Sequence, residues 1–117
     1  MKYLPLAGKI ALVTGAGSQI GLGRSMTMAL IKAGAKVAML DIDRTSLERT
    51  AAEIENVEGE GCLMSEICDI SDPQSVDKSV ENIVNTFGSV DILVNNAGIM
   101  IPSEISRNSK SINFFCN

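Results

Sequence analysis

The chain has 117 residues and a mass of 12.4 kDa, enough for one domain with a buried core, and its 45% apolar and 21% charged residues exclude wholesale disorder. It contains no His, which excludes His-based acid/base catalysis and His-ligated metal sites, and its only Tyr is Tyr3. The net charge of −4 argues against nucleic acid as a partner. Residues 1–40 hold five basic residues and no acid, which fits a phosphate ligand, although solvated surface lysines explain each of them equally well.

The three cysteines, Cys62, Cys68 and Cys116, form neither a disulfide framework nor a CxxC zinc pair. Free thiols are typical of a reducing, intracellular compartment. Pro5 interrupts the start of the chain before a signal-peptide core, and no apolar stretch approaches the length of a membrane span. We therefore expect a cytoplasmic protein with no membrane segment and no metal site.

The first predicted elements are two buried strands with a helix between them. The apolar run over residues 9–14 ends in glycine and is typical of a buried strand. A glycine-rich turn follows, and residues 24–33 then form a helix that Gly34 ends. The run over residues 36–40, closed by Asp41, is the second strand.

Two more helices and two more strands complete the pattern. Asp43 can cap a second helix with apolar residues at helical spacing, and a weaker strand follows over residues 62–68. Asp72, which stands before a proline, starts a third helix. This helix ends at Gly88 and leads to a fourth strand over residues 90–94.

Strands and helices thus alternate until Pro102, after which neither period continues. Strands joined by helical crossovers run parallel, and such crossovers are right-handed. We predict an α/β fold with an open, twisted parallel sheet in strand order 3-2-1-4 and helices on both faces, truncated after the fourth strand. Residues 1–100 would form this half of a doubly wound domain, and residues 101–117 an irregular tail.

The glycine-rich turn over residues 14–24 (TGAGSQIGLGR) indicates an anion site. A pyrophosphate binds to backbone N–H groups at a helix N-terminus, and a side chain at the closest approach would block it, so glycine is needed there. The absence of any acid before Asp41 fits such a site. A plain strand-to-helix turn stays the alternative for this motif taken alone.

Asp41, at the end of the second strand, predicts the kind of dinucleotide. Its carboxylate can accept two hydrogen bonds from an adenosine ribose and would repel a 2′-phosphate, which favours NAD over NADP. The residues from Ser18 to Leu22 offer no positive charge to a 2′-phosphate, and Arg44 is the one nearby cation that argues the other way. The alternative role of Asp41 is a helix cap shared with Asp43.

The chain resembles the short-chain dehydrogenase/reductase family from about residue 9 to residue 98. Four stretches together carry the resemblance: Thr14-Gly15…Gly21-Leu22-Gly23, Asp41, Asp69-Ile70 and Asn95-Asn96-Ala97-Gly98. The resemblance implies that residues 1–100 are the NAD-binding Rossmann half-domain of an oxidoreductase acting on alcohol and ketone groups.

The family's glycine motif can be aligned in two ways. One alignment reads TGxxxxxGxG, with two residues inserted, and places Gly21, Leu22 and Gly23 at the closing GxG. The other places Gln19 at the middle glycine, where its side chain would lie close to the pyrophosphate. We prefer the insertion.

The resemblance also implies the rest of the site. Asp69 would meet the adenine amino group and Ile70 would lie along the ring, although Asp69 serves equally well as a strand-end cap. Asn95 would line the ribose and nicotinamide side and tie its strand to the neighbours. The expected cofactor-binding residues are Gly15, Ser18, Gly21, Leu22, Gly23, Asp41, Asp69, Ile70, Asn95, Ala97 and Gly98.

The family's catalytic Ser and its Tyr-xxx-Lys pair lie downstream of the Asn-Asn-Ala-Gly run, and residues 99–117 contain no counterpart. We therefore expect no catalytic residue in this chain, which would be inactive alone. A truncation, an alternatively spliced end and a boundary error in the sequence are the three explanations that stay open. The alternative function is a non-catalytic dinucleotide- or partner-binding fragment, and a methyltransferase with a similar β-α-β site is a third. The uncovered fourth strand predicts poor stability and either aggregation or dependence on a partner chain, such as a second copy, unless Phe114 and Phe115 fold back over this edge.

Overall fold

The computed structural model describes residues 3–17 and 21–96, and there strands and helices alternate as the sequence predicts. The elements are β1 (Ile10–Thr14), α1 (Leu22–Lys32), β2 (Lys36–Asp41), α2 (Arg44–Glu58), β3 (Leu63–Ile67), α3 (Pro73–Phe87) and β4 (Ile92–Asn95). The predicted boundaries are confirmed to within about two residues; α1, for example, begins at Leu22 rather than Arg24. The predicted tail, residues 101–117, lies outside the described residues.

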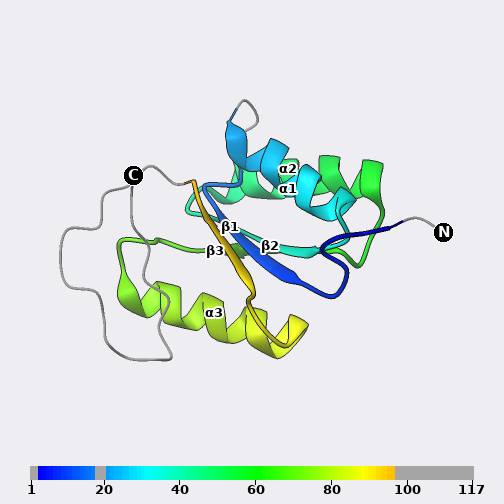
Figure 1. Ribbon diagram of the computed structural model, residues 1–117. Helices are drawn as coiled ribbons and strands as arrows, with labels where there is room; N and C mark the ends of the chain where they lie inside the picture. Colours follow the sequence, from blue (N-terminus) through cyan, green and yellow to red (C-terminus); the bar gives the residue numbers. More distant parts are fainter. Residues whose placement is uncertain (1–2, 18–20, 97–117) are drawn as a thin grey trace.

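The strands of the described residues form one parallel sheet in the order β3-β2-β1-β4, which confirms the predicted strand order. β1 is central, because it pairs with β2 on one side and with β4 on the other. Figure 1 shows α1 and α2 over one face of the sheet and α3 over the other. All of β1 is buried because both faces are covered, which explains its largely apolar sequence.

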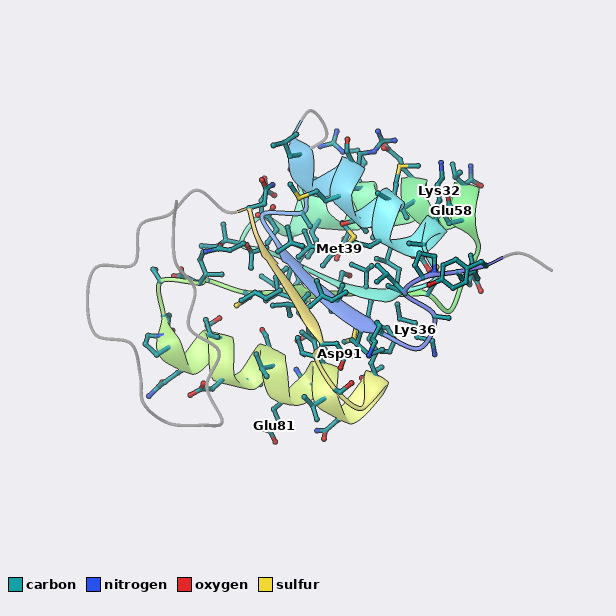
Figure 2. All side chains as sticks on the ribbon, viewed as in Figure 1. Lys32, Lys36, Met39, Glu58, Glu81 and Asp91 are labelled. Atoms are coloured by element: carbon teal, nitrogen blue, oxygen red, sulfur yellow. The ribbon has the colours of Figure 1, made fainter. Side chains whose placement is uncertain are left out.

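Alternate residues of the strands build two cores, one on each face of the sheet. On one face, Leu12 and Leu40 pack among residues of α3 that include Ile83. On the other face, Val13 and Met39 pack against the apolar side of α2 (Figure 2). Each fully buried large apolar side chain contributes about 1.5–3 kcal/mol, so these layers hold the helices firmly against the sheet.

Two helices begin at carboxylate caps that the sequence predicts. Asp43 accepts the Ser46 N–H at 3.3 Å, and Asp72 accepts the Gln74 N–H at 3.1 Å, with Pro73 in the first turn of α3. The hydrogen bond from the Ser46 backbone, followed by that from its hydroxyl, lowers the pKa of Asp43. These caps fix where the loops after β2 and β3 turn into helices.

No helix in the described ranges is long and apolar enough to cross a membrane.

β3 and β4 are the edges of the sheet as far as the described residues extend. Leu93 on β4 is 39% exposed, and the other residues of that strand are half-buried. An apolar edge favours pairing with another strand. Pairing with a second copy of the chain stays a prediction.

Candidate functional site

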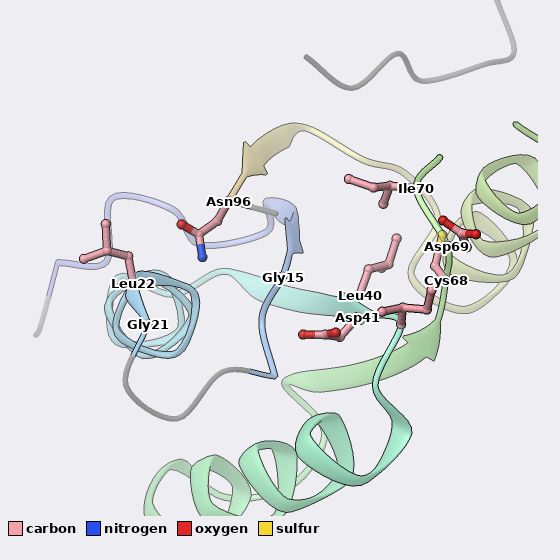
Figure 3. A pocket seen from close by; sticks show the side chains of 10 residues that line it. Gly15, Gly21, Leu22, Leu40, Asp41, Cys68, Asp69, Ile70 and Asn96 are labelled. Atoms are coloured by element: carbon pink, nitrogen blue, oxygen red, sulfur yellow. The ribbon is translucent and has the colours of Figure 1, made fainter. Parts of the chain in front are cut away.

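A cavity of about 400 Å³ lies at the carboxyl ends of the strands, between the start of α1 and the loops that follow β2 and β3 (Figure 3). The strand order explains its position. The chain runs outward from β1 to β2 and β3 and then returns to pair β4 on the other side of β1, so the loops diverge there. The lining residues are Gly15, Gly21, Leu22, Leu40, Asp41, Ile42, Cys68, Asp69, Ile70 and Asn96.

The N-terminus of α1 faces this cavity without a side-chain cap. Gly21 is the N-cap residue, with φ −90° and ψ 170°, and the first turn contains no acid. The first N–H groups of a helix have no partner within the helix, and the helix dipole makes this end positive. Since Gly21 and Leu22 line the cavity, this end of α1 is suited to an anion such as a pyrophosphate.

Gly23 allows α1 to approach the end of β1 closely. A Cβ at this position would lie 2.7 Å from the Gly15 carbonyl oxygen, 2.9 Å from Ala16 Cα and 3.0 Å from Asn96 Nδ2. Two of these atoms belong to the backbone, so they cannot move without shifting the turn. Gly15 itself has φ +62°, a left-handed conformation that glycine adopts without strain. A side chain at position 23 would therefore separate α1 from the end of β1, and the alignment in which Gly21 and Gly23 form the closing pair of glycines stays a prediction.

Two backbone amides hold the Asp41 carboxylate at the cavity. Its Oδ2 accepts the Gly17 N–H at 2.9 Å, and its Oδ1 accepts the Asp43 N–H at 3.0 Å. A carboxylate oxygen can accept more than one hydrogen bond, so both oxygens retain capacity for a hydroxyl donor in the cavity. The cap of α2 is Asp43, and Asp41 takes part in it only through the Asp43 N–H.

Two basic residues of α1 pair with acids of α2. Arg24 Nη2 lies 3.3 Å from Glu53 Oε2, and Lys32 Nζ lies 3.9 Å from Glu58 Oε1 (Figure 2). The basic first third of the sequence is therefore partly neutralised within the fold. The backbone N–H groups at the start of α1 remain the candidate anion-binding group at the cavity.

The end of β3 forms the opposite wall of the cavity. Cys68 and Ile70 are only 2% and 6% exposed, and with Leu40 they make an apolar surface. The Asp69 carboxylate accepts the Ser71 hydroxyl at 2.6 Å and the Ser71 N–H at 3.0 Å. These bonds, the hydroxyl's first, lower the pKa of Asp69. An apolar wall with a charged acceptor at its rim suits a flat ring that carries an amino group, and Asp69 also caps the turn after β3.

Thr14, at the end of β1, ties the end of β4 to the centre of the sheet. Its hydroxyl donates to Asn95 Oδ1 at 2.9 Å and accepts the Asn96 N–H at 2.9 Å. Asn95 thus connects its strand to the neighbouring one, whereas Asn96 lines the cavity. The Asn95 Nδ2 is buried with no hydrogen-bond partner in the described part of the chain.

Sequence reasoning found part of this lining and missed part of it. The expected residues that line the cavity are Gly15, Gly21, Leu22, Asp41, Asp69 and Ile70. The lining residues that it missed are Leu40, Ile42, Cys68 and Asn96. Leu40 and Ile42 adjoin Asp41 in the chain, and Cys68 adjoins Asp69. Their position beside predicted site residues was the signal that could have identified them. Gly23 and Asn95 are not among the described lining residues, and Ser18, Ala97 and Gly98 lie outside the described residues.

No group of three or more Cys, Asp or Glu side chains in residues 3–17 and 21–96 is arranged to hold a metal ion. The polar groups at the cavity are instead a helix N-terminus, two carboxylates and one amide. This set is suited to recognising hydroxyl, amino and phosphate groups of one extended ligand.

Comparisons with known proteins agree with this arrangement. The short chain dehydrogenase family model matches residues 9–114. The short chain dehydrogenase/reductase dpmpG of Macrophomina phaseolina is 40% identical over 95 residues, which are 81% of this chain and 53% of that protein. The 15-hydroxyprostaglandin dehydrogenase (NAD(+)) of Homo sapiens is 42% identical over 93 residues, which are 79% of this chain and 34% of that protein.

A solved structure shows the same similarity in three dimensions. The 3-ketoacyl-(acyl-carrier-protein) reductase from Brucella melitensis complexed with NADH matches with a TM-score of 0.66 and 44% identity, over 75% of this chain and 33% of that one. The chain spans about half the length of the Macrophomina relative and about a third of the other two proteins.

Proposed function

Because the chain belongs to the short chain dehydrogenase family, we propose that its cavity binds a nicotinamide dinucleotide, with NAD preferred to NADP, as the cofactor-binding part of an oxidoreductase acting on alcohol and ketone groups. The observation that carries this proposal is the Asp41 carboxylate, fixed by two backbone amides at a cavity that the uncapped N-terminus of α1 also faces. A carboxylate and a helix N-terminus at one cavity suit a ligand with both a ribose diol and a pyrophosphate.

The cavity offers a separate surface to each part of the cofactor. Asp41 would accept the hydroxyls of the adenosine ribose, and the pyrophosphate would lie on the N–H groups beside Gly21. The adenine ring would lie against Ile70, with Asp69 at its amino group. The volume of about 400 Å³ is within the range of pockets that hold small ligands. The family resemblance adds Asn95, Ala97 and Gly98 at the nicotinamide side and Ser18 at the glycine-rich turn.

The charges around Asp41 support NAD rather than NADP. A 2′-phosphate would meet the Asp41 carboxylate, and the adjoining cavity residue is the uncharged Ile42, which is 62% exposed. The nearby cation Arg44 lies 3.4 Å from Glu48, one turn along α2. This pairing offsets the attraction that Arg44 would offer to a phosphate.

The bound nicotinamide would supply hydride chemistry. The residues of this chain would bind and orient the cofactor. In the family a Tyr acts as the general acid/base, but the only Tyr of this sequence, Tyr3, precedes β1 and is 83% exposed, whereas the cavity lies at the other end of the strands. We therefore assign Tyr3 no catalytic role and propose that these 117 residues hold the cofactor without the proton donor for carbonyl reduction.

Calorimetric titration of the purified chain with NAD and with NADP tests the proposal. NAD should bind more tightly than NADP. Asp41→Ala should weaken NAD binding about 10- to 100-fold, because it removes charge-assisted hydrogen bonds. It should also bring the NAD and NADP dissociation constants closer together. The control is Glu81→Ala, an exposed acid on the side of α3 that points away from the sheet (Figure 2). Tighter NADP binding, or equal effects of the two variants, would contradict the proposal.

A further inference from the structure

Thr50 is a fully buried hydroxyl on α2 that binds the glycine-rich turn rather than its own helix. Its Oγ1 donates to the Gly17 carbonyl oxygen at 2.7 Å, across 33 positions of sequence. Two other threonines, Thr27 and Thr86, donate instead to the carbonyl four residues earlier in their own helices. Thr50 therefore uses its hydrogen bond for a long-range contact that helix formation does not require.

Gly17 is held on both sides of its Cα. Its carbonyl accepts the Thr50 hydroxyl, and its N–H donates to Asp41 Oδ2 at 2.9 Å. A Cβ at Gly17 would lie 2.9 Å from both Asp41 Oδ2 and the Leu47 backbone nitrogen. There is thus no space for a side chain between Gly17 and Asp41, and because the Gly17 N–H bonds to Asp41 Oδ2, the position of Gly17 and the position of the Asp41 carboxylate depend on each other.

We propose that Thr50 is a positioning residue for dinucleotide selectivity. It holds Gly17 so that the Gly17 N–H fixes the Asp41 carboxylate toward the cavity. This inference rests on the proposed function, in which Asp41 attracts the ribose hydroxyls and repels a 2′-phosphate. A carboxylate released from Gly17 would lose part of both effects. The affinity for NAD would therefore fall, and the preference for NAD over NADP would fall with it.

Loss of selectivity separates this role from a merely structural one. A variant that only loosened the core would reduce the folded fraction and weaken both ligands by the same factor. A variant that released Asp41 would weaken NAD while leaving NADP nearly unchanged, because the lost repulsion offsets the lost contacts. The ratio of the two dissociation constants therefore reports the position of Asp41.

The test compares Thr50→Val, which keeps the shape but removes the donor, with Thr50→Ser, which keeps the donor. Thr86→Val is the control: it makes the same chemical change and removes a hydroxyl-to-carbonyl bond of 2.8 Å, but at an exposed position on α3, away from the cavity. NAD and NADP dissociation constants are measured on folded protein, with amide exchange of Gly17 followed without ligand. We expect Thr50→Val to weaken NAD binding about tenfold, to reduce the ratio of the NADP to the NAD dissociation constant, and to speed amide exchange of Gly17. Thr50→Ser and Thr86→Val should stay close to wild type in all three measurements.

Three results would overturn the inference: unchanged NAD affinity in Thr50→Val, equal weakening of NAD and NADP, or a serine variant as impaired as the valine variant. If Thr50→Val does not fold, Thr50→Cys, which retains only a weak donor, takes its place under the same criteria. A wild-type chain that does not bind NAD counts against the proposed function itself. Wild-type binding that the Thr50 variants leave unaltered counts against Thr50 alone.

Discussion

At position 23, the neighbouring backbone leaves no room for a side chain. The missing Cβ would lie 2.7 Å from the Gly15 carbonyl oxygen, and that oxygen belongs to the turn that follows β1. A side chain here must push α1 away from the sheet. Because the start of α1 lines the cavity, the same displacement would move the N–H groups that we propose bind the pyrophosphate.

We therefore predict that Gly23→Ala lowers the free energy of unfolding by about 1–3 kcal/mol and weakens NAD by more than about tenfold. Chemical denaturation and calorimetric titration measure the two effects. Gly61→Ala is the control, because Gly61 has φ +92° but a Cβ added there would have no neighbour within 4 Å, so the substitution introduces backbone strain alone. If Gly61→Ala weakened NAD as much as Gly23→Ala did, close packing of α1 would not be the reason.

Residue-scale features were unevenly accessible from the sequence. Asp41 and Asp43 were predictable from their places in the chain. Asp41 directly follows the apolar run of β2, where a dinucleotide-binding acid is expected, and Asp43 stands just before a helix, where a carboxylate cap is expected. The Thr50–Gly17 hydrogen bond was not, because it joins residues 33 positions apart and nothing local marks Thr50. Asn96 was part of a recognised run, but only the structure shows that it, rather than Asn95, lines the cavity.

At the scale of elements, α3 is held by one buried side of an otherwise polar helix. Ile83 is fully buried in the core on its face of the sheet, whereas the next residue, Val84, is 40% exposed. We predict that Ile83→Ala lowers the free energy of unfolding by about 2–5 kcal/mol, through lost burial and a cavity, and that Val84→Ala changes it by about 0.5 kcal/mol or less. Urea denaturation of both variants checks this, and similar losses would refute the packing described for α3.

The helices and strands were predictable from the spacing of apolar residues and from the glycines and caps at their ends. Glycines and capping carboxylates end and begin the helices where the sequence predicts, since Gly59 and Gly88 follow α2 and α3 with φ of +89° and +98°. The start of α1 was placed too late because Gly23 has poor helix propensity. Its close packing against Gly15 and Ala16 outweighs that propensity, which is a tertiary effect that a local pattern does not contain.

At the scale of the whole molecule, basic and acidic residues occupy different parts of the sequence, but the basic residues of α1 pair with acids of α2. Residues 41–91 carry thirteen acids and three bases, and the two cations of α1 that pair with α2 face those acids. In the proposed function, the anion site is therefore built from the backbone N–H groups at the start of α1, and the selectivity for NAD comes from the Asp41 carboxylate, which two backbone amides hold. Strand order brings both to the same edge of the sheet, because parallel strands end together at their carboxyl termini.

The most direct test of this arrangement is a map of NAD binding on the isotopically labelled chain by amide chemical shifts. We predict that NAD produces saturable shifts clustered at the cavity, and that Glu55 and Glu60, which line a separate hollow beside the last turns of α2, stay unperturbed. The residues expected to shift are Gly15, Gly21, Leu22, Asp41, Asp69, Ile70 and Asn96. Shifts absent from this set at saturating NAD, or centred elsewhere on the sheet, would contradict a dinucleotide site at the carboxyl ends of the strands.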